Sequence, residues 1–146
     1  MDESLYGDKL PALKPDLVLS CGDLPFDYLE YLVSRLDVPV LYVLGNHDPS
    51  LTPPDMTWMP LRSELPPLAG PQGCTNIDGR LVEVRGLRIA GLGGSIRYKE
   101  GPNQYSQAQM GWRAIKLEFR VRLILPERQL KSSRVINVVP SRLIEI

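Results

Sequence analysis

Two short polar clusters carry the side chains of this sequence that are best suited to chemistry. The first is Asp23, which follows Gly22, and the second is Asn46-His47-Asp48, which follows Gly45. A carboxylate is a hard oxygen ligand, an amide oxygen is a weaker one, and a histidine supplies a nitrogen donor or a proton. Together these residue types suit metal binding and acid–base chemistry. The glycines before them allow sharp turns and a close approach of the backbone to a ligand.

Both clusters come directly after apolar runs, which must position them. Residues 17–21 read Leu-Val-Leu-Ser-Cys, and residues 40–44 read Val-Leu-Tyr-Val-Leu. Continuous apolar runs of this length predict strands that are buried on both faces, as in a sheet covered by helices. Ligands of open α/β sheets bind outside the carboxyl ends of the strands, so the two clusters are expected to face one crevice.

The residues between the two runs predict a helix. Asp27 is expected to cap it, with Glu30 reaching back to complete a capping box. Its apolar residues follow the spacing that places one helix face on a sheet, namely Leu29, Leu32, Val33 and Leu36. The strand, helix and strand together predict an N-terminal βαβ unit with a right-handed crossover.

The middle of the chain predicts a long loop and then short strands. Residues 49–73 hold seven of the fourteen prolines, which excludes a long helix or a central strand there. A meander of short strands is expected from Thr75, with a tight turn at Asp78-Gly79. Residues 81–84 and 87–90 are predicted strands, joined through Arg85-Gly86.

A second, longer helix is predicted from Ser106, whose spacing to Gln109 is that of a capping box, to about Leu125. Its apolar positions are interpreted as one wide core-facing stripe, made of Met110, Trp112, Ala114, Ile115, Leu117, Phe119 and Val121. Its basic residues are interpreted as a solvated face, made of Arg113, Lys116, Arg120 and Arg122. The end of the chain, residues 135–139 and 143–146, predicts a closing hairpin.

Composition indicates one globular domain over residues 1–146. Apolar residues make up 43% and charged residues 23%, and equal numbers of basic and acidic residues give a net charge of zero. That balance does not indicate a nucleic-acid partner, since such binders show a basic excess. No apolar run is long enough for a membrane span, and no signal peptide fits the charged first thirty residues. Cys21 and Cys74 are expected to be reduced, which favours a cytoplasmic location.

The order of the motifs resembles a known family. Leu17-Val-Leu-Ser-Cys-Gly-Asp23, followed by Val43-Leu-Gly-Asn-His-Asp48, is similar to the calcineurin-like metallophosphoesterase superfamily, and residues 86–98, 101–105 and 134–137 resemble its later segments. The resemblance implies an α/β fold with a two-sheet core flanked by helices, here in truncated form. It also implies metal-dependent hydrolysis of phosphoesters, with a phosphoester as the substrate.

The resemblance also implies residue roles. Asp23 would be the carboxylate that bridges two metals, and Asn46 would ligate the second metal. His47 would lie near the phosphate, and Asp48 would orient His47 and favour its cationic form. The cofactor would be a divalent metal of the Mn, Fe, Zn or Mg class. Two such ions clamp the phosphate and activate a hydroxide for in-line attack.

Three departures from the family pattern limit this expectation. Members open with a strand that carries a metal-ligating Asp, and the residues before Leu17 contain no apolar run of that kind. Members also carry a Gly-His motif and a Gly-His-x-His motif after the long helix, whereas His47 is the sole histidine of this sequence. A full two-metal centre is therefore not expected within one chain. The remaining residues could build one weak, Mg²⁺-like site with several waters.

Three interpretations stay open at this point. The first is a metallophosphoesterase that is weakly active or inactive as a single chain. The second is an enzyme in which another chain or copy supplies the missing ligands. The third is a non-catalytic binding or scaffold protein that keeps a remnant of the fold. No membrane partner is expected, whereas an unpaired strand edge predicts self-association.

Overall fold

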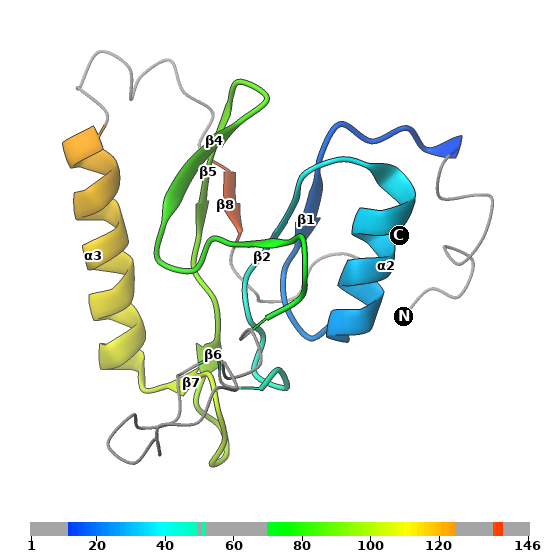
Figure 1. Ribbon diagram of the computed structural model, residues 1–146. Coiled ribbons are helices and arrows are strands. Elements are labelled where there is room, and N and C mark those ends of the chain that lie inside the picture. Colours follow the sequence, from blue (N-terminus) through cyan, green and yellow to red (C-terminus); the bar gives the residue numbers. More distant parts are fainter. Residues whose placement is uncertain (1–11, 50, 52–69, 125–135, 139–146) are drawn as a thin grey trace, which may run out of the picture.

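The computed structural model of the chain describes residues 12–49, 51, 70–124 and 136–138. In this part the chain is a mixed α/β structure, with small sheets that contain parallel strands and with two helices. Figure 1 shows the helices α2 (Phe26–Leu36) and α3 (Gln107–Ile124) on opposite sides of the molecule, with strands between them. Neither of these described helices is long and apolar enough to cross a lipid bilayer.

The first sheet is parallel and contains the predicted βαβ unit. β1 (Val18–Ser20) pairs with β2 (Val40–Tyr42) in parallel, and α2 connects the two strands, so the strand–helix–strand order and the parallel pairing are confirmed. β3 (Thr75–Asn76) pairs with the other side of β2 and is also parallel to it. The predicted meander from Thr75 is wrong at its first strand, because β3 joins the parallel sheet instead. β2 is therefore central and is buried along its whole length.

The start of α2 differs from the predicted capping box. The helix begins at Phe26 after Pro25, whose carbonyl oxygen accepts hydrogen bonds from the N–H groups of Tyr28 and Leu29, and no side chain caps it. Glu30 does not reach back to the helix start, because its carboxylate accepts the backbone N–H of Gln72 at 2.8 Å. A tertiary contact to the chain before β3 thus replaces the local contact that the sequence pattern suggested.

The second sheet contains the predicted strand pair. β4 (Leu81–Val84) and β5 (Leu87–Gly91) are antiparallel, and β8 (Ile136–Val138) pairs with β5 in parallel. Arg85 and Gly86 both take positive φ angles in the connecting turn, as a tight hairpin requires. A third, two-stranded sheet joins β6 (Ser95–Ile96) to β7 (Gln104–Tyr105).

Three apolar clusters stack these elements into four layers. The first cluster joins α2 to β2 and the residues after it, through side chains that include Leu29 and Tyr42. The second lies between the two larger sheets and contains Leu41 and Ile89. The third joins β5 to α3 and contains Ala90 and Leu117. Neighbouring residues of one strand thus face different clusters, which explains why β2 and β5 read as continuous apolar runs.

The long helix begins as predicted but buries less than predicted. The capping box is confirmed, because Gln109 N–H donates to the hydroxyl of Ser106 at 3.2 Å and Ser106 N–H donates to the side chain of Gln109 at 2.8 Å. Leu117 and Val121 are buried against β5, with Met110 packed beside them. The rest of the predicted core stripe is wrong, since only one helix face meets the sheet. The side chains that remain more than half exposed include Trp112, Ile115 and Phe119.

Two further predictions fall largely outside the described residues. These are the long loop over residues 49–73 and the closing hairpin over residues 135–146, of which the structure describes only parts. The two cysteines are described and both are free. Burial raises the pKa of the Cys21 and Cys74 thiols, and the negative charge of Glu30 raises that of Cys74 further. Both shifts favour the protonated, less nucleophilic thiol.

Because α3 has a buried and an exposed face, alanine substitutions at two leucines of this helix should lower the free energy of unfolding by very different amounts. Leu117→Ala should lower the free energy of unfolding by about 2–4 kcal/mol, because Leu117 is only 9% exposed and the change leaves a cavity against β5. Leu123→Ala should change it by less than about 0.5 kcal/mol, because Leu123 is 72% exposed. Urea unfolding followed by circular dichroism measures both values. Equal losses in the two variants would contradict the assigned helix face.

Candidate functional site

The two polar clusters lie at the same edge of the parallel sheet. Asp23 follows the carboxyl end of β1, and residues 46–48 follow the carboxyl end of β2. The two strands are adjacent, with Ser20 opposite Tyr42 in the pairing register. Parallel neighbours end on the same side, so the sheet brings both clusters together as the sequence predicted.

The carboxylate of Asp48 connects the two clusters directly. Its Oδ2 atom accepts the backbone N–H of Asp23 at 3.0 Å and the backbone N–H of Gly45 at 2.8 Å. Asp48 is only 7% exposed. A buried carboxylate loses its hydration, and two N–H donors replace that hydration here. Asp48 therefore holds the loop after β1 and the loop after β2 in one arrangement.

A second contact links the same loops in the other direction. The carboxylate of Asp23 accepts the backbone N–H of His47 at 2.8 Å through Oδ1. Asp23 itself takes a left-handed backbone conformation, with φ at 59°. Aspartate tolerates that conformation better than most residues. The loop after β1 thus receives a hydrogen bond from the second cluster and also donates one to it.

Glycine is required where the two loops meet. Gly22 has a φ of 98°, and a Cβ atom added there would overlap the backbone nitrogen and Cα of Gly45. A Cβ atom on Gly45 would in turn overlap the carboxylate of Asp23. The two glycines therefore allow the backbones of the two loops to approach closely, and a side chain at either position would push the loops apart.

Two residues to which the sequence assigned no role also hold the second cluster. The side-chain amide of Asn103 donates to the carbonyl oxygen of Gly45 at 3.1 Å and to that of Asp48 at 2.9 Å. The side-chain amide of Asn46 donates to the hydroxyl of Tyr98 at 3.0 Å. Asn103 and Tyr98 both belong to stretches that resemble the family, and that resemblance was the available signal for them.

The contacts of Asp48 differ from those that the resemblance implied. Both residues are described, and no hydrogen bond joins the imidazole of His47 to the carboxylate of Asp48 in this structure. Asp48 instead contacts backbone N–H groups, and His47 uses its own backbone N–H toward Asp23. The catalytic roles of His47 and Asp48 therefore stay predictions, while the structural role of Asp48 is directly visible.

The metal-ligating side chains that the structure describes do not form a two-metal centre. Within residues 12–49, 51, 70–124 and 136–138, no group of three or more His, Cys, Asp or Glu side chains could hold a metal ion. One oxygen of Asp23 and one of Asp48 already accept backbone N–H groups. The metal-binding roles of Asp23 and Asn46 that the resemblance implied therefore stay predictions.

Comparison with known proteins identifies the family of this chain. A family model described as calcineurin-like phosphoesterase matches residues 3–135. The chain therefore belongs to the calcineurin-like phosphoesterase family, whose members typically bind divalent metals. A search of curated proteins found no match, and a search of solved structures found none.

The contact between the two loops predicts an unequal response to alanine at two glycines. Gly86→Ala should cost about 1–2 kcal/mol of unfolding free energy, because Gly86 also has a positive φ but a Cβ there would meet nothing within 4 Å. Gly22→Ala should cost at least about 2 kcal/mol more, since its Cβ also separates the loops. Thermal or urea unfolding of both variants measures the difference. Equal costs would show that the loops do not meet at Gly22.

Proposed function

We propose that this chain is a phosphoester-binding protein with a partial metallophosphoesterase-like core. The observation that carries the proposal is the pair of hydrogen bonds from Asp48, which brings Asp23 and the Asn46-His47 cluster together at one sheet edge. The four layers, with α2 and α3 outside two packed sheets, support the fold part of the proposal. Family membership supports the phosphoester as the substrate class.

In this proposal the residues at the sheet edge have separate tasks. The side-chain oxygens of Asp23 and Asn46 would hold one divalent cation, which would neutralise charge on a bound phosphate. Tyr98 orients the amide of Asn46, because its hydroxyl accepts the amide N–H; the amide oxygen would then be free to ligate the cation. The imidazole of His47 contacts the phosphate, and Asp48 keeps the loops together.

The proposed activity of the single chain is slow hydrolysis or none. Two-metal phosphoester hydrolysis needs ions that stabilise both the attacking and the leaving oxygen. The sequence has one histidine, and the described residues offer no cluster of three metal-ligating side chains. The same observation favours a second candidate function, in which the chain binds or scaffolds a partner without catalysis.

A titration with Mn²⁺ tests the proposal and separates these two candidates. We expect one Mn²⁺ per chain, with a dissociation constant of about 10⁻⁴–10⁻³ M, as for sites with few protein ligands. Asp23→Asn should remove this binding while it preserves the fold, because asparagine keeps an oxygen for His47 N–H and tolerates the left-handed backbone. Electron paramagnetic resonance of free Mn²⁺ measures the binding.

The matched control is Asp16→Asn, which removes the same charge beyond the amino end of β1, away from the site. It should leave Mn²⁺ binding unchanged. With Mn²⁺ present, hydrolysis of an aryl phosphate should stay near the uncatalysed rate. Turnover of about 1–10³ s⁻¹ that disappears in Asp23→Asn would contradict the slow-hydrolysis part. No Mn²⁺ binding would favour the non-catalytic candidate.

A further inference from the structure

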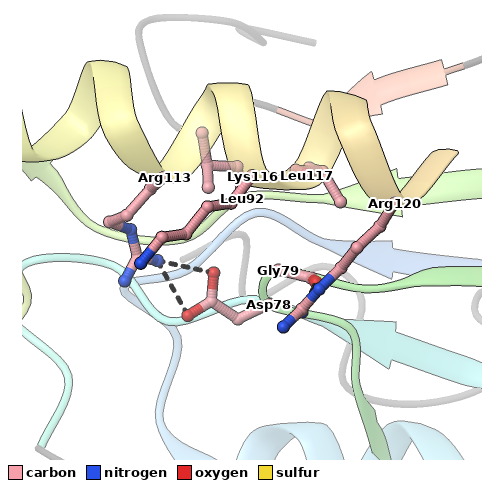
Figure 2. A pocket seen from close by; sticks show the side chains of 7 residues that line it. All are labelled: Asp78, Gly79, Leu92, Arg113, Lys116, Leu117 and Arg120. Carbon is pink, nitrogen blue, oxygen red and sulfur yellow. Dashed lines mark hydrogen bonds and ion pairs between the residues drawn. The ribbon is translucent and has the colours of Figure 1, made fainter. Parts of the chain in front are cut away.

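A small basic pocket lies between α3 and the turn after β3. It has a volume of about 180 Å³, and Figure 2 shows the side chains of Arg113, Lys116 and Arg120 extending from the helix toward the turn. Neither the metal-site residues Asp23 and Asn46 nor His47 belongs to its lining. The full lining consists of Asp78, Gly79, Leu92, Arg113, Lys116, Leu117 and Arg120.

Arg113 is held in place by contacts on several sides. One of its terminal nitrogens donates to both carboxylate oxygens of Asp78, at 2.7 and 2.9 Å. The guanidinium also lies over the ring of Tyr105, 4.1 Å from its centroid. Arg113 therefore neutralises the charge of Asp78, so Asp78 contributes little to balancing the charges of Lys116 and Arg120.

The other two basic side chains lack such a counter-charge. Arg120 donates to the carbonyl oxygen of Gly79 at 2.7 Å, which is a neutral partner. Lys116 makes no hydrogen bond or ion pair with any residue that the structure describes. Three cations and one carboxylate leave a net charge of +2 on the lining. Residues 113, 116 and 120 follow the three- and four-residue spacing that places like charges side by side on a helix, which is unfavourable without a bound anion.

The size of the pocket indicates the kind of anion. Pockets for drug-sized ligands have volumes of roughly 300–1,000 Å³, and this pocket is smaller than that. Arginine and lysine are the side chains that proteins use for phosphate, and Leu92 and Leu117 form an apolar wall that reduces screening by water. We propose that this pocket binds a phosphate group, either as inorganic phosphate or as the phosphate of a monoester.

The pocket is separate from the candidate metal site but is connected to it. Asp78 accepts the backbone N–H of Gly93 at 2.7 Å, and Gly94 N–H donates to the carbonyl oxygen of Leu44 at 2.7 Å. Leu44 directly precedes Gly45, whose N–H is bound by Asp48. Asp78 follows β3, so it lies at the same sheet edge as Asp23 and Asn46. Phosphate binding in the pocket itself requires no metal, so it does not depend on the proposed function.

The test is a titration of the metal-free, ¹⁵N-labelled full chain with inorganic phosphate at constant ionic strength, followed by NMR. We expect saturable shifts of the Gly79 and Leu117 amides. Lys116→Gln should weaken binding about threefold or more, and Lys116→Gln with Arg120→Gln about tenfold or more, as for loss of charge-assisted hydrogen bonds. Lys116 has no described partner and its loss relieves like-charge repulsion, so its single variant should unfold at a temperature no lower than that of the wild type.

The matched control is Arg122→Gln on the same helix. Arg122 is exposed and pairs with Glu118 at 2.6 Å, so its loss should leave phosphate affinity unchanged. A second titration with phenyl phosphate distinguishes inorganic phosphate from a phosphate monoester as the ligand. Saturable binding of either ligand, or of both, supports the proposed phosphate site and shows which form it accepts. Three results would overturn the proposal: saturation by neither ligand at millimolar concentration, equal weakening in Arg122→Gln, or binding that survives the double variant and is lost in His47→Gln.

Discussion

The candidate site depends on one buried carboxylate that binds two backbone N–H groups from different loops. Asp48 accepts the N–H of Asp23 and the N–H of Gly45, and it is almost fully buried. Hydrogen bonds to charged groups contribute about 1.5–3 kcal/mol each, and an unpaired buried N–H costs a similar amount. The contact therefore stabilises a close approach of two loops that each carry a glycine at the meeting point.

The layers of the fold give this contact a rigid base. β1 and β2 end side by side, and the apolar cluster that includes Leu41 and Ile89 packs their sheet against β5. The loops that follow the strands are further held by Asn103, which reaches the carbonyl groups of Gly45 and Asp48. These contacts hold the backbone of the loops from two sides, which preorganises the site. The ion pair between Arg113 and Asp78 links α3 to the same edge of the parallel sheet.

The sequence predicted features that depend on neighbours along the chain. The two apolar runs, the turn at Arg85-Gly86 and the capping box of Ser106 all rest on local patterns. Predictions failed where contacts with residues distant in the sequence replace the local contacts that the pattern suggests. Glu30 bonds Gln72 rather than its own helix start, and Trp112 is 64% exposed because periodicity does not reveal which helix face a sheet covers. The contacts of Asp48 could not be predicted either, since they require the folded approach of Gly22 to Gly45.

The central claim is that Asp48 holds the two loops together, and amide hydrogen exchange tests it most directly. In Asp48→Ala the N–H groups of Asp23 and Gly45 lose their shared acceptor, so both should exchange much faster than in the wild type. The N–H of Gln109, which is bonded to Ser106 on α3, should keep its wild-type rate and serves as the internal control. Wild-type exchange rates at both Asp23 and Gly45 in this variant would contradict the account.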